Sequence, residues 1–139
     1  MNIFSRITSW ATERGITQQL PDKNGFVKNI VSELGEFIDD TGEYAEIDAI
    51  ADIMVFCITE IPKYGKDPAL VLQEVYKEIN SRTGAWSKEE QKWLKFKTPE
   101  AMELWVAADY SKCSYLVDDT TKELKEELRQ ILLEETHLS

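Results

Sequence analysis

The sequence predicts an all-α protein, a helical bundle of four main helices with extra C-terminal helices. Two observations predict this class. Apolar residues recur every three or four positions through most of the chain, which is the interval of one helical face. Glycine, proline and capping residues interrupt that interval and divide the chain into helices of ordinary length. No segment has the apolar–polar alternation that predicts a strand. We expect residues 1–139 to form a single domain.

The first three helices are expected at about residues 3–14, 24–40 and 43–61. Gly15 closes the first helix, Pro21 and Gly25 mark the break after it, and Thr41-Gly42 ends the second. The second and third helices each carry an apolar stripe for the core. The stripe residues are Phe26, Ile30, Leu34, Phe37 and Ile38 on the second helix, and Ile47, Ile50, Ala51, Met54, Val55 and Ile58 on the third.

Capping signals place the later elements. Asp67-Pro68 predicts an N-cap followed by proline at the first position of the fourth helix, which stops before Ser81. Ser87-Lys88-Glu89-Glu90 fits a capping box and predicts a short helix. Thr98-Pro99 predicts another, and the last helix is expected at about residues 120–135. The helix after Thr98 is expected to contain Met102, Leu104, Trp105 and Ala108.

Composition and charge exclude several classes of protein. A formal net charge of -10 makes duplex nucleic acid a poor partner, because phosphate binding needs a basic surface. No apolar run approaches the ~20 residues of a membrane-spanning helix, and the first residues do not resemble a secretory signal. Cys57 and Cys113 lack metal-site or redox spacing, so we expect free thiols in the cytoplasm.

Acidic residues gather on one face of each of two consecutive helices. Because residues advance by ~100° along a helix, Asn29, Glu33, Glu36 and Asp40 share a narrow arc of the second helix. Asp48 and Asp52 share a face of the third helix. Like charges at these spacings destabilise a helix unless a cation lies between them. Mg²⁺ prefers such oxygen ligands, with Mn²⁺ as an alternative ion, whereas chance alignment among 26 acidic residues is the competing explanation.

Two neighbouring features favour the metal site. Gly35 lies inside the second helix, where glycine costs ~1 kcal/mol relative to alanine, and this suggests the close approach of another helix or a ligand. Asp52 is set among small and apolar residues, so it is expected to be partly buried and to need a partner.

The segments Ser32-Glu33-Leu34-Gly35-Glu36 and Asp48-Ala49-Ile50-Ala51-Asp52 resemble the all-α nucleotide pyrophosphatase superfamily, whose signature is ExxE on one helix and ExxD on the next. The chain looks most like small bacteriophage-encoded, MazG-like members. The resemblance covers roughly residues 5–90, the expected core, and leaves residues 91–139 as a helical C-terminal extension. It implies Mg²⁺-dependent cleavage of an NTP or dNTP to the monophosphate and pyrophosphate.

One position departs from that signature. The first acid of ExxD corresponds to position 49, which is Ala49, and the pattern here is Asp48-x-x-x-Asp52. Three alternatives stay open. Asp48 takes over as a ligand, ~100° away on the helix; the site has three carboxylates and an extra water; or its activity is impaired.

The resemblance assigns roles to the acidic residues and to a basic segment. Glu33, Glu36, Asp48 and Asp52 are the expected metal ligands, and Glu36, with Glu33 beside it, is the expected catalytic base. The stretch after the fourth helix is similar to the part of MazG-like proteins that contacts the nucleotide. Its expected contacts with the substrate are Lys77, Asn80, Arg82 and Lys88, with an exposed basic surface as the competing explanation.

Other residues invite a role that the sequence does not support. Trp10 is expected in the core rather than over a base. His137, the only histidine, has no serine or cysteine partner for a triad. The segment 109–113 is expected to be a plain connection between helices.

In so short a chain, a helix pair that carries its own site leaves much apolar surface uncovered. The family that the sequence resembles forms dimers or tetramers. We therefore expect a homodimer or homotetramer. Two other functions remain alternatives. Ala49 favours a catalytically weak nucleotide-binding regulator on the same scaffold, and the net charge favours an acidic interaction protein that mimics nucleic acid.

Overall fold

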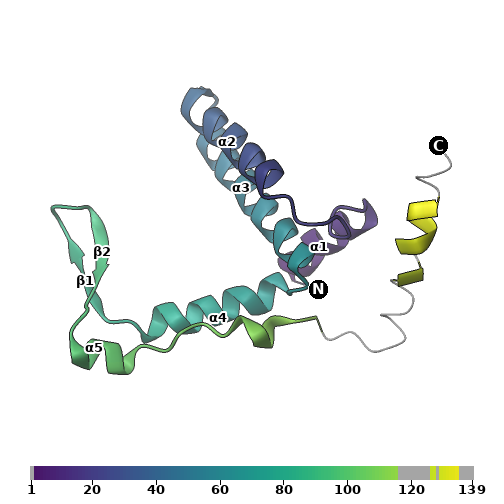
Figure 1. Cartoon of the computed structure of the whole chain (residues 1–139). Helices are drawn as coiled ribbons and strands as arrows, with labels where there is room; N and C mark the ends of the chain where they lie inside the picture. The colour runs from purple at the N-terminus through teal and green to yellow at the C-terminus, as the bar shows by residue number, and fades with distance from the viewer. Residues whose placement is uncertain (1, 116–125, 128, 135–139) are drawn as a thin grey trace. The chain divides into compact units, whose positions relative to one another are not determined.

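The computed structural model describes residues 2–115, 126–127 and 129–134. Helices dominate this part of the chain, so the predicted, predominantly all-α class is confirmed (Figure 1). The chain divides into two compact units, Met1–Gly65 with Tyr115–Ser139, and Lys66–Ser114. The helices are α1 (Ile3–Glu13), α2 (Lys23–Asp39), α3 (Ala45–Glu60), α4 (Pro68–Ser81) and α5 (Pro99–Leu104), with 3-10 helices η1 (Ile61–Tyr64) and η2 (Tyr110–Cys113).

In the first unit, α1 leads through a short loop into the α2–α3 hairpin. The Asn2 side chain caps α1 by accepting a hydrogen bond of 2.9 Å from the backbone N–H of Ser5. Gly15 follows the helix with φ 74°, a left-handed conformation that glycine adopts without strain. The predicted start and end of this helix are therefore confirmed, and α1 packs against α3.

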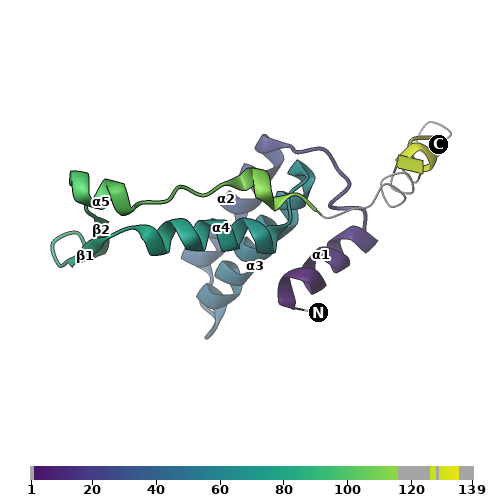
Figure 2. The same cartoon turned by 90° about the horizontal axis from the view of Figure 1, so that it is seen from below.

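Helices α2 and α3 lie side by side along their length (Figures 1 and 2). Asp22 caps α2 by accepting a 3.1 Å hydrogen bond from the backbone N–H of Gly25. The five residues between the helices are too few for any arrangement but a close antiparallel pair. The hairpin therefore brings the faces of the two helices together at the level of the predicted acidic residues.

In the second unit, α4 begins as predicted. Asp67 accepts a 2.9 Å hydrogen bond from the backbone N–H of Ala69, and Pro68 occupies the first turn. After α4 the chain forms strands β1 (Gly84–Ser87) and β2 (Lys92–Lys95), an antiparallel pair in which Trp86 faces Trp93.

The short helix predicted at Ser87–Glu90 is therefore wrong. The capping bond itself forms, since the backbone N–H of Glu90 donates to Ser87 Oγ over 3.2 Å. It closes a hairpin turn instead of opening a helix, because Gln91 takes a left-handed φ of 55° and the chain doubles back. The two strands are four residues each, which is too short to show an alternating pattern in sequence.

Helix α5 is shorter than predicted, because it ends at Leu104 and leaves Trp105 and Ala108 outside it. From there the chain runs back alongside α4 (Figures 1 and 2). The segment 109–113 is a 3-10 turn on this return path, with Cys113 buried and its carbonyl accepting a 2.7 Å hydrogen bond from the N–H of Asp67.

Residues 126–127 and 129–134 are helical, and the rest of the helix predicted at 120–135 lies outside the described residues, as does His137. Cys57 and Cys113 are both free thiols, Cys57 half-buried, and burial raises the pKa of Cys57. In the described part of the chain, no helix has the length and apolar character that crossing a membrane requires.

Candidate metal centre

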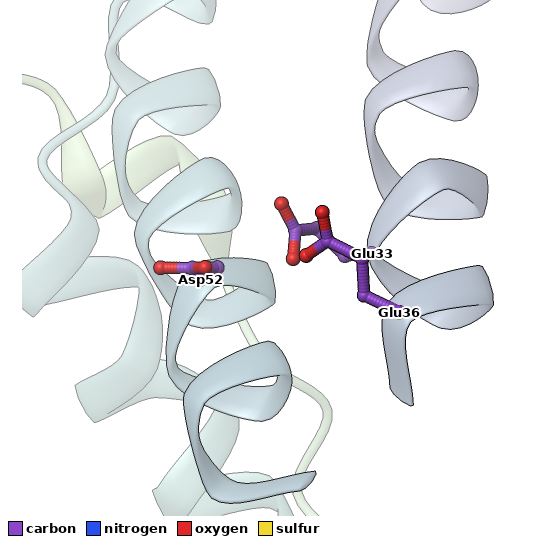
Figure 3. A group of neighbouring side chains, drawn as sticks. All are labelled: Glu33, Glu36 and Asp52. Atoms are coloured by element: carbon purple, nitrogen blue, oxygen red, sulfur yellow. The ribbon is translucent and has the colours of Figure 1, made fainter. Parts of the chain in front are cut away.

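Three of the four predicted ligands come together between α2 and α3. Glu33 and Glu36, one turn apart on α2, extend toward Asp52 on α3 (Figure 3). One carboxylate oxygen from each residue lies within 4.8 Å of the other two. Glu33 and Asp52 are half-buried and Glu36 is exposed, so the cluster has an open side. We call Glu33, Glu36 and Asp52 the acidic triad.

Glu33 carries the electrostatic strain of the triad. A hydrogen bond to Glu36, partial burial and the negative charges of Glu36, Asp52 and Asp48 raise the pKa of Glu33 to about 7. Its Oε2 atom is buried and has no hydrogen-bond partner in the described part of the chain. Without a cation, the fold therefore holds this carboxyl half-protonated near neutral pH, and a buried oxygen is left unsatisfied.

Asp48 lies outside the triad. It is exposed in the first turn of α3, and its negative charge is the smallest of the causes that raise the pKa of Glu33. Asn29 lies one turn before Glu33 on α2, and Asp40 is the C-cap of that helix. Helical geometry thus aligned six polar residues, of which three are close enough to share one ion.

Ala49 is buried, with an exposed fraction of 1%. It precedes Asp52 by one turn of α3, at the position where the resembled signature carries an acid. Gly35 behaves differently from the expectation of a close approach, because a Cβ atom built on it meets no atom of the described residues within 4 Å. No neighbour among the described residues therefore requires a glycine there.

The first unit contains a cavity of about 800 Å³ beside the triad, between α1 and the α2–α3 hairpin. Its volume is within the range of small-molecule sites. Glu33 and Asp52 lie in its wall. The cavity is also lined by Trp10, Phe26, Phe56, Glu60 and Lys63.

Trp10 is not a core residue, so that prediction is wrong. Its side chain is 45% exposed and lines the cavity, and the Arg14 guanidinium stacks on its ring at 4.7 Å. Apolar spacing cannot distinguish the wall of a cavity from the core, because both positions lie on the inward side of a helix.

Sequence reasoning missed Glu60 and Lys63. The Lys63 Nζ atom lies 3.0 Å from Glu60 Oε2, and both side chains are largely buried, with exposed fractions of 17% and 12%. The signal was available as an i, i+3 pair of opposite charges. It was overlooked because Lys63 falls in a stretch that the sequence marks as a turn, where charged residues are ordinarily solvated.

The predicted basic contacts all belong to the second unit, where two of them already have partners. Lys77 pairs with Glu74 at 2.9 Å. Arg82 pairs with Glu78 at 3.3 Å and stacks over Trp105 at 4.8 Å. Asn80 is exposed at the end of α4, and Lys88 is exposed in the hairpin turn. Lys77 is itself 60% exposed, so Lys77, Asn80 and Lys88 keep exposed polar groups for a ligand, whereas Arg82 is half-buried.

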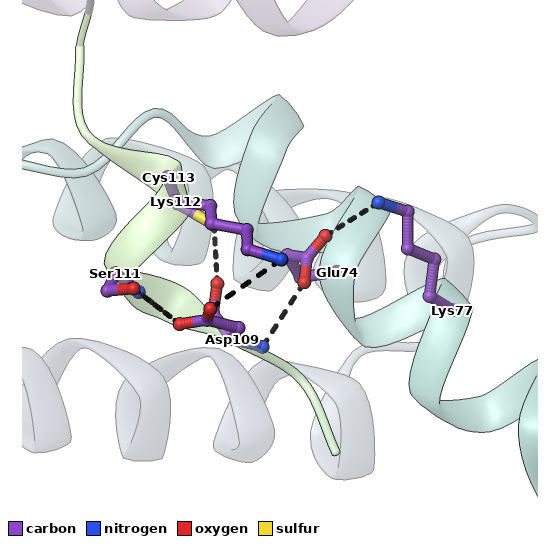
Figure 4. A network of polar contacts seen from close by, with 6 residues as sticks. All are labelled: Glu74, Lys77, Asp109, Ser111, Lys112 and Cys113. Carbon is purple, nitrogen blue, oxygen red and sulfur yellow. Dashed lines mark hydrogen bonds and ion pairs between the residues drawn. The ribbon is translucent and has the colours of Figure 1, made fainter. Parts of the chain in front are cut away.

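The two α4 glutamates instead hold the returning segment, and Figure 4 shows the contacts of Glu74. Glu74 Oε1 accepts a 3.2 Å hydrogen bond from the N–H of Asp109, and Glu78 Oε2 accepts one of 2.6 Å from the N–H of Ala108. Hydrogen bonds from Lys77 and from the Asp109 backbone lower the pKa of Glu74, and the bond from Ala108 lowers that of Glu78. These contacts are structural, and they explain the acids of α4 without a ligand.

No known protein family, curated protein or solved structure matches this chain. A functional assignment therefore depends on the acidic triad, the cavity and the short signature themselves.

Proposed function

We propose that this protein is a Mg²⁺-dependent nucleoside triphosphate pyrophosphohydrolase that cleaves an NTP or dNTP to the monophosphate and pyrophosphate. The observation that carries the proposal is the acidic triad, three carboxylates from two helices with oxygens within 4.8 Å of one another. Their spacing along the sequence is the one that resembles the all-α nucleotide pyrophosphatase signature.

The residues of the triad fit a divalent cation. Carboxylates this close repel one another. A hydrogen bond to Glu36, burial and the charges of Glu36, Asp52 and Asp48 together raise the pKa of Glu33. The unsatisfied Oε2 atom of Glu33 offers a further ligand position. An oxygen-only set of three carboxylates with one open side suits Mg²⁺, or Mn²⁺, which keep water or phosphate oxygens in their remaining positions.

A bound Mg²⁺ supplies charge neutralisation at the phosphates and lowers the pKa of a water molecule. Glu33 and Glu36 would hold the ion together with Asp52. This pair is suited to accept the proton that water loses as its oxygen bonds to the α-phosphorus and the bond to pyrophosphate breaks. We place the general base on the pair, with Glu36 as the more exposed member.

The cavity supports a substrate with an organic part as well as phosphates. Its wall contains the aromatic rings of Trp10, Phe26 and Phe56, and also Glu33 and Asp52 of the triad. This lining matches a ligand that is flat and apolar at one end and binds a cation through phosphates at the other. Lys77, Asn80, Arg82 and Lys88 remain proposed contacts of the polyphosphate; Lys77 and Arg82 are paired with Glu74 and Glu78 but have further N–H donors.

We also propose that the protein is a homodimer or homotetramer. On α2, an exposed stripe of apolar residues lies beside the arc that packs on α3, and α3 carries a second exposed stripe. The residues are Val27, Val31, Leu34 and Ile38 on α2, and Ile47, Ile50 and Met54 on α3. Spacings of three and four residues are those of a helix–helix contact, so a second copy of the hairpin is the proposed cover.

A second candidate is a nucleotide-binding regulator with little turnover, and Ala49 favours it. Position 49 is buried one turn from Asp52, so the missing acid of the signature removes a carboxylate that would have pointed into the protein. We keep the cytoplasm as the proposed location, since both cysteines are free.

The deciding experiment incubates the protein with each canonical NTP and dNTP plus Mg²⁺ and measures pyrophosphate release. Turnover that Glu36→Gln abolishes supports the pyrophosphohydrolase. Tight Mg²⁺-dependent nucleotide binding without turnover supports the regulator. Neither binding nor turnover with any nucleotide rejects both functions and favours an acidic interaction protein.

A further inference from the structure

The cavity beside the triad holds a second charged feature that the proposed chemistry does not use. Glu60 and Lys63, at the end of α3 and in η1, both line it. Lys63 Nζ forms an ion pair with Glu60 Oε2 at 3.0 Å, while Glu60 Oε1 is buried without a hydrogen-bond partner in the described residues. A carboxylate oxygen removed from water and left without a donor is costly, so the pair is not explained by stability alone.

The position of the pair suits one part of a nucleotide. Glu60 follows Asp52 by eight residues on α3, which corresponds to about 12 Å along the helix axis. Phe56 and Thr59 line the cavity between those two acids, and Trp10 and Phe26 enter its wall from α1 and α2. A ligand with its phosphates at the triad would therefore place its flat organic end among aromatic rings and near the Glu60–Lys63 pair.

The pair offers an acceptor beside a donor. Glu60 has one oxygen free, and rotation about the Cγ–Cδ bond, a soft torsion, exchanges which oxygen faces Lys63. Lys63 has three N–H donors, of which one is used by Glu60. A nucleobase edge has the complementary arrangement, an N–H group next to a carbonyl oxygen or ring nitrogen.

We propose that the Glu60–Lys63 pair reads the base of the nucleotide, with Glu60 accepting an N–H of the base edge and Lys63 donating to its neighbouring acceptor. This inference rests on the proposed function of the triad, because the triad fixes which end of the substrate is anionic. Its consequence is that the protein selects among bases. A site built to hydrogen-bond its substrate rejects a ligand that leaves its buried polar groups unpaired.

The test compares wild type with Glu60→Gln, which keeps the shape of the side chain and removes its charge. Glu13→Gln is the matched control, since it makes the same change in an exposed acid of α1 outside the cavity. Two quantities are measured for every base, kcat/KM for the NTP and dNTP with Mg²⁺, and the Kd of the nucleoside monophosphate by calorimetry without Mg²⁺.

We expect wild type to differ by about 100-fold or more in kcat/KM between its best and worst base. Glu60→Gln should reduce that ratio by roughly tenfold or more, chiefly by weakening the best base, with a parallel loss in monophosphate affinity. Glu13→Gln should leave the ratio unchanged. If Glu60→Gln does not fold, Lys63→Met, which removes the donor of the pair, should lower the ratio in the same way.

Two results overturn the inference while leaving the triad's chemistry in place: wild type that treats all bases alike, or a Glu60→Gln loss that is equal for every base. Base-selective monophosphate binding that depends on Glu60, without pyrophosphate release, supports the inference and rejects only the hydrolase. Wild type that neither binds nor cleaves any nucleotide rejects both.

Discussion

Glu33 and Glu36 lie one turn apart on α2, and one carboxylate oxygen of each lies within 4.8 Å of the other and of Asp52 on α3. Two carboxyl groups this close can form a hydrogen bond only while one of them holds a proton. The raised pKa of Glu33, about 7, is the consequence. A cation and that proton therefore compete for the same place, and metal binding should release protons near neutral pH.

The first prediction concerns the stability of the protein without metal. A folded-state pKa raised from 4.5 to about 7 means that the folded protein holds a proton on Glu33 that the unfolded chain has released. Its contribution to stability is therefore full below pH 4.5 and is lost as the pH rises through about 7. In EDTA, the Tm of Glu33→Gln minus that of wild type should therefore increase as the pH rises across this range.

The comparison of the two proteins at each pH cancels the titration of other groups. Addition of Mg²⁺ should restore wild type more than the variant at pH 7.5 and above, because only wild type keeps all three carboxylates. A Tm difference that stays constant between pH 4.5 and 7 would contradict the coupling within the triad.

A second prediction separates the triad from the rest of its acidic face. Asp52→Asn keeps the shape of the side chain and removes a ligand. Mg²⁺ affinity and pyrophosphate release should each fall by roughly 100-fold or more, because even residues that only support a metal ligand cause losses of roughly 10- to 100-fold. Asp40→Asn makes the same change at the end of α2, outside the triad, and should change both by less than about threefold. Calorimetric titration with Mg²⁺ and a pyrophosphate assay supply the two values, and equal losses in both variants would reject the triad as the site.

Much of this site could be predicted from sequence because it depends on helical geometry. Glu33 and Glu36 are three residues apart and therefore share a face of α2. The short loop after α2 makes α3 antiparallel to it, which places Asp52 near that face. Asp48 shows the limit of that reasoning. It shares a face with Asp52 and its charge helps to raise the pKa of Glu33, but it is not one of the three carboxylates within 4.8 Å of one another, so spacing alone does not show whether it binds the ion.

What failed depends on contacts that sequence does not display. Ser87 makes the bond of a capping box, but the cross-strand pair of Trp86 and Trp93 and the left-handed Gln91 turn the chain into a hairpin. Trp10 has the spacing of a core residue and lines a cavity, because exposure depends on which segment packs opposite. Glu60 and Lys63 could not be recognised from sequence, because only the structure shows that this buried ion pair lines the cavity.

A third prediction tests the proposed assembly through the exposed stripe of α2. Val31→Lys places a charge in the centre of that stripe and should convert the oligomer to monomers, because an unpaired charge cannot be buried in an apolar contact. Val106→Lys is the matched control, since both valines are 59% exposed and Val106 lies in the second unit. Light scattering coupled to size exclusion gives the mass of each variant. An unchanged mass for Val31→Lys, or a wild type that is already monomeric, would exclude this interface.

A fourth prediction concerns the glycine that allows the hairpin of the second unit. A Cβ atom at Gly84 would lie 2.5 Å from Trp93 Cζ2 and would also meet the backbone oxygen of Leu94. The Trp93 ring therefore lies against Gly84, and the Leu94 backbone oxygen cannot move away without opening the strand pair. Gly84→Ala should destabilise the second unit by about 1–3 kcal/mol, the usual cost of overpacking, and should shift the tryptophan emission as Trp93 becomes more exposed. Gly42→Ala is the control, because among the described residues its Cβ would meet only Ala45, at 3.8 Å, an ordinary contact. Urea titrations followed by tryptophan fluorescence measure both variants, and a Gly84→Ala midpoint equal to that of wild type would show that the ring does not lie against this glycine.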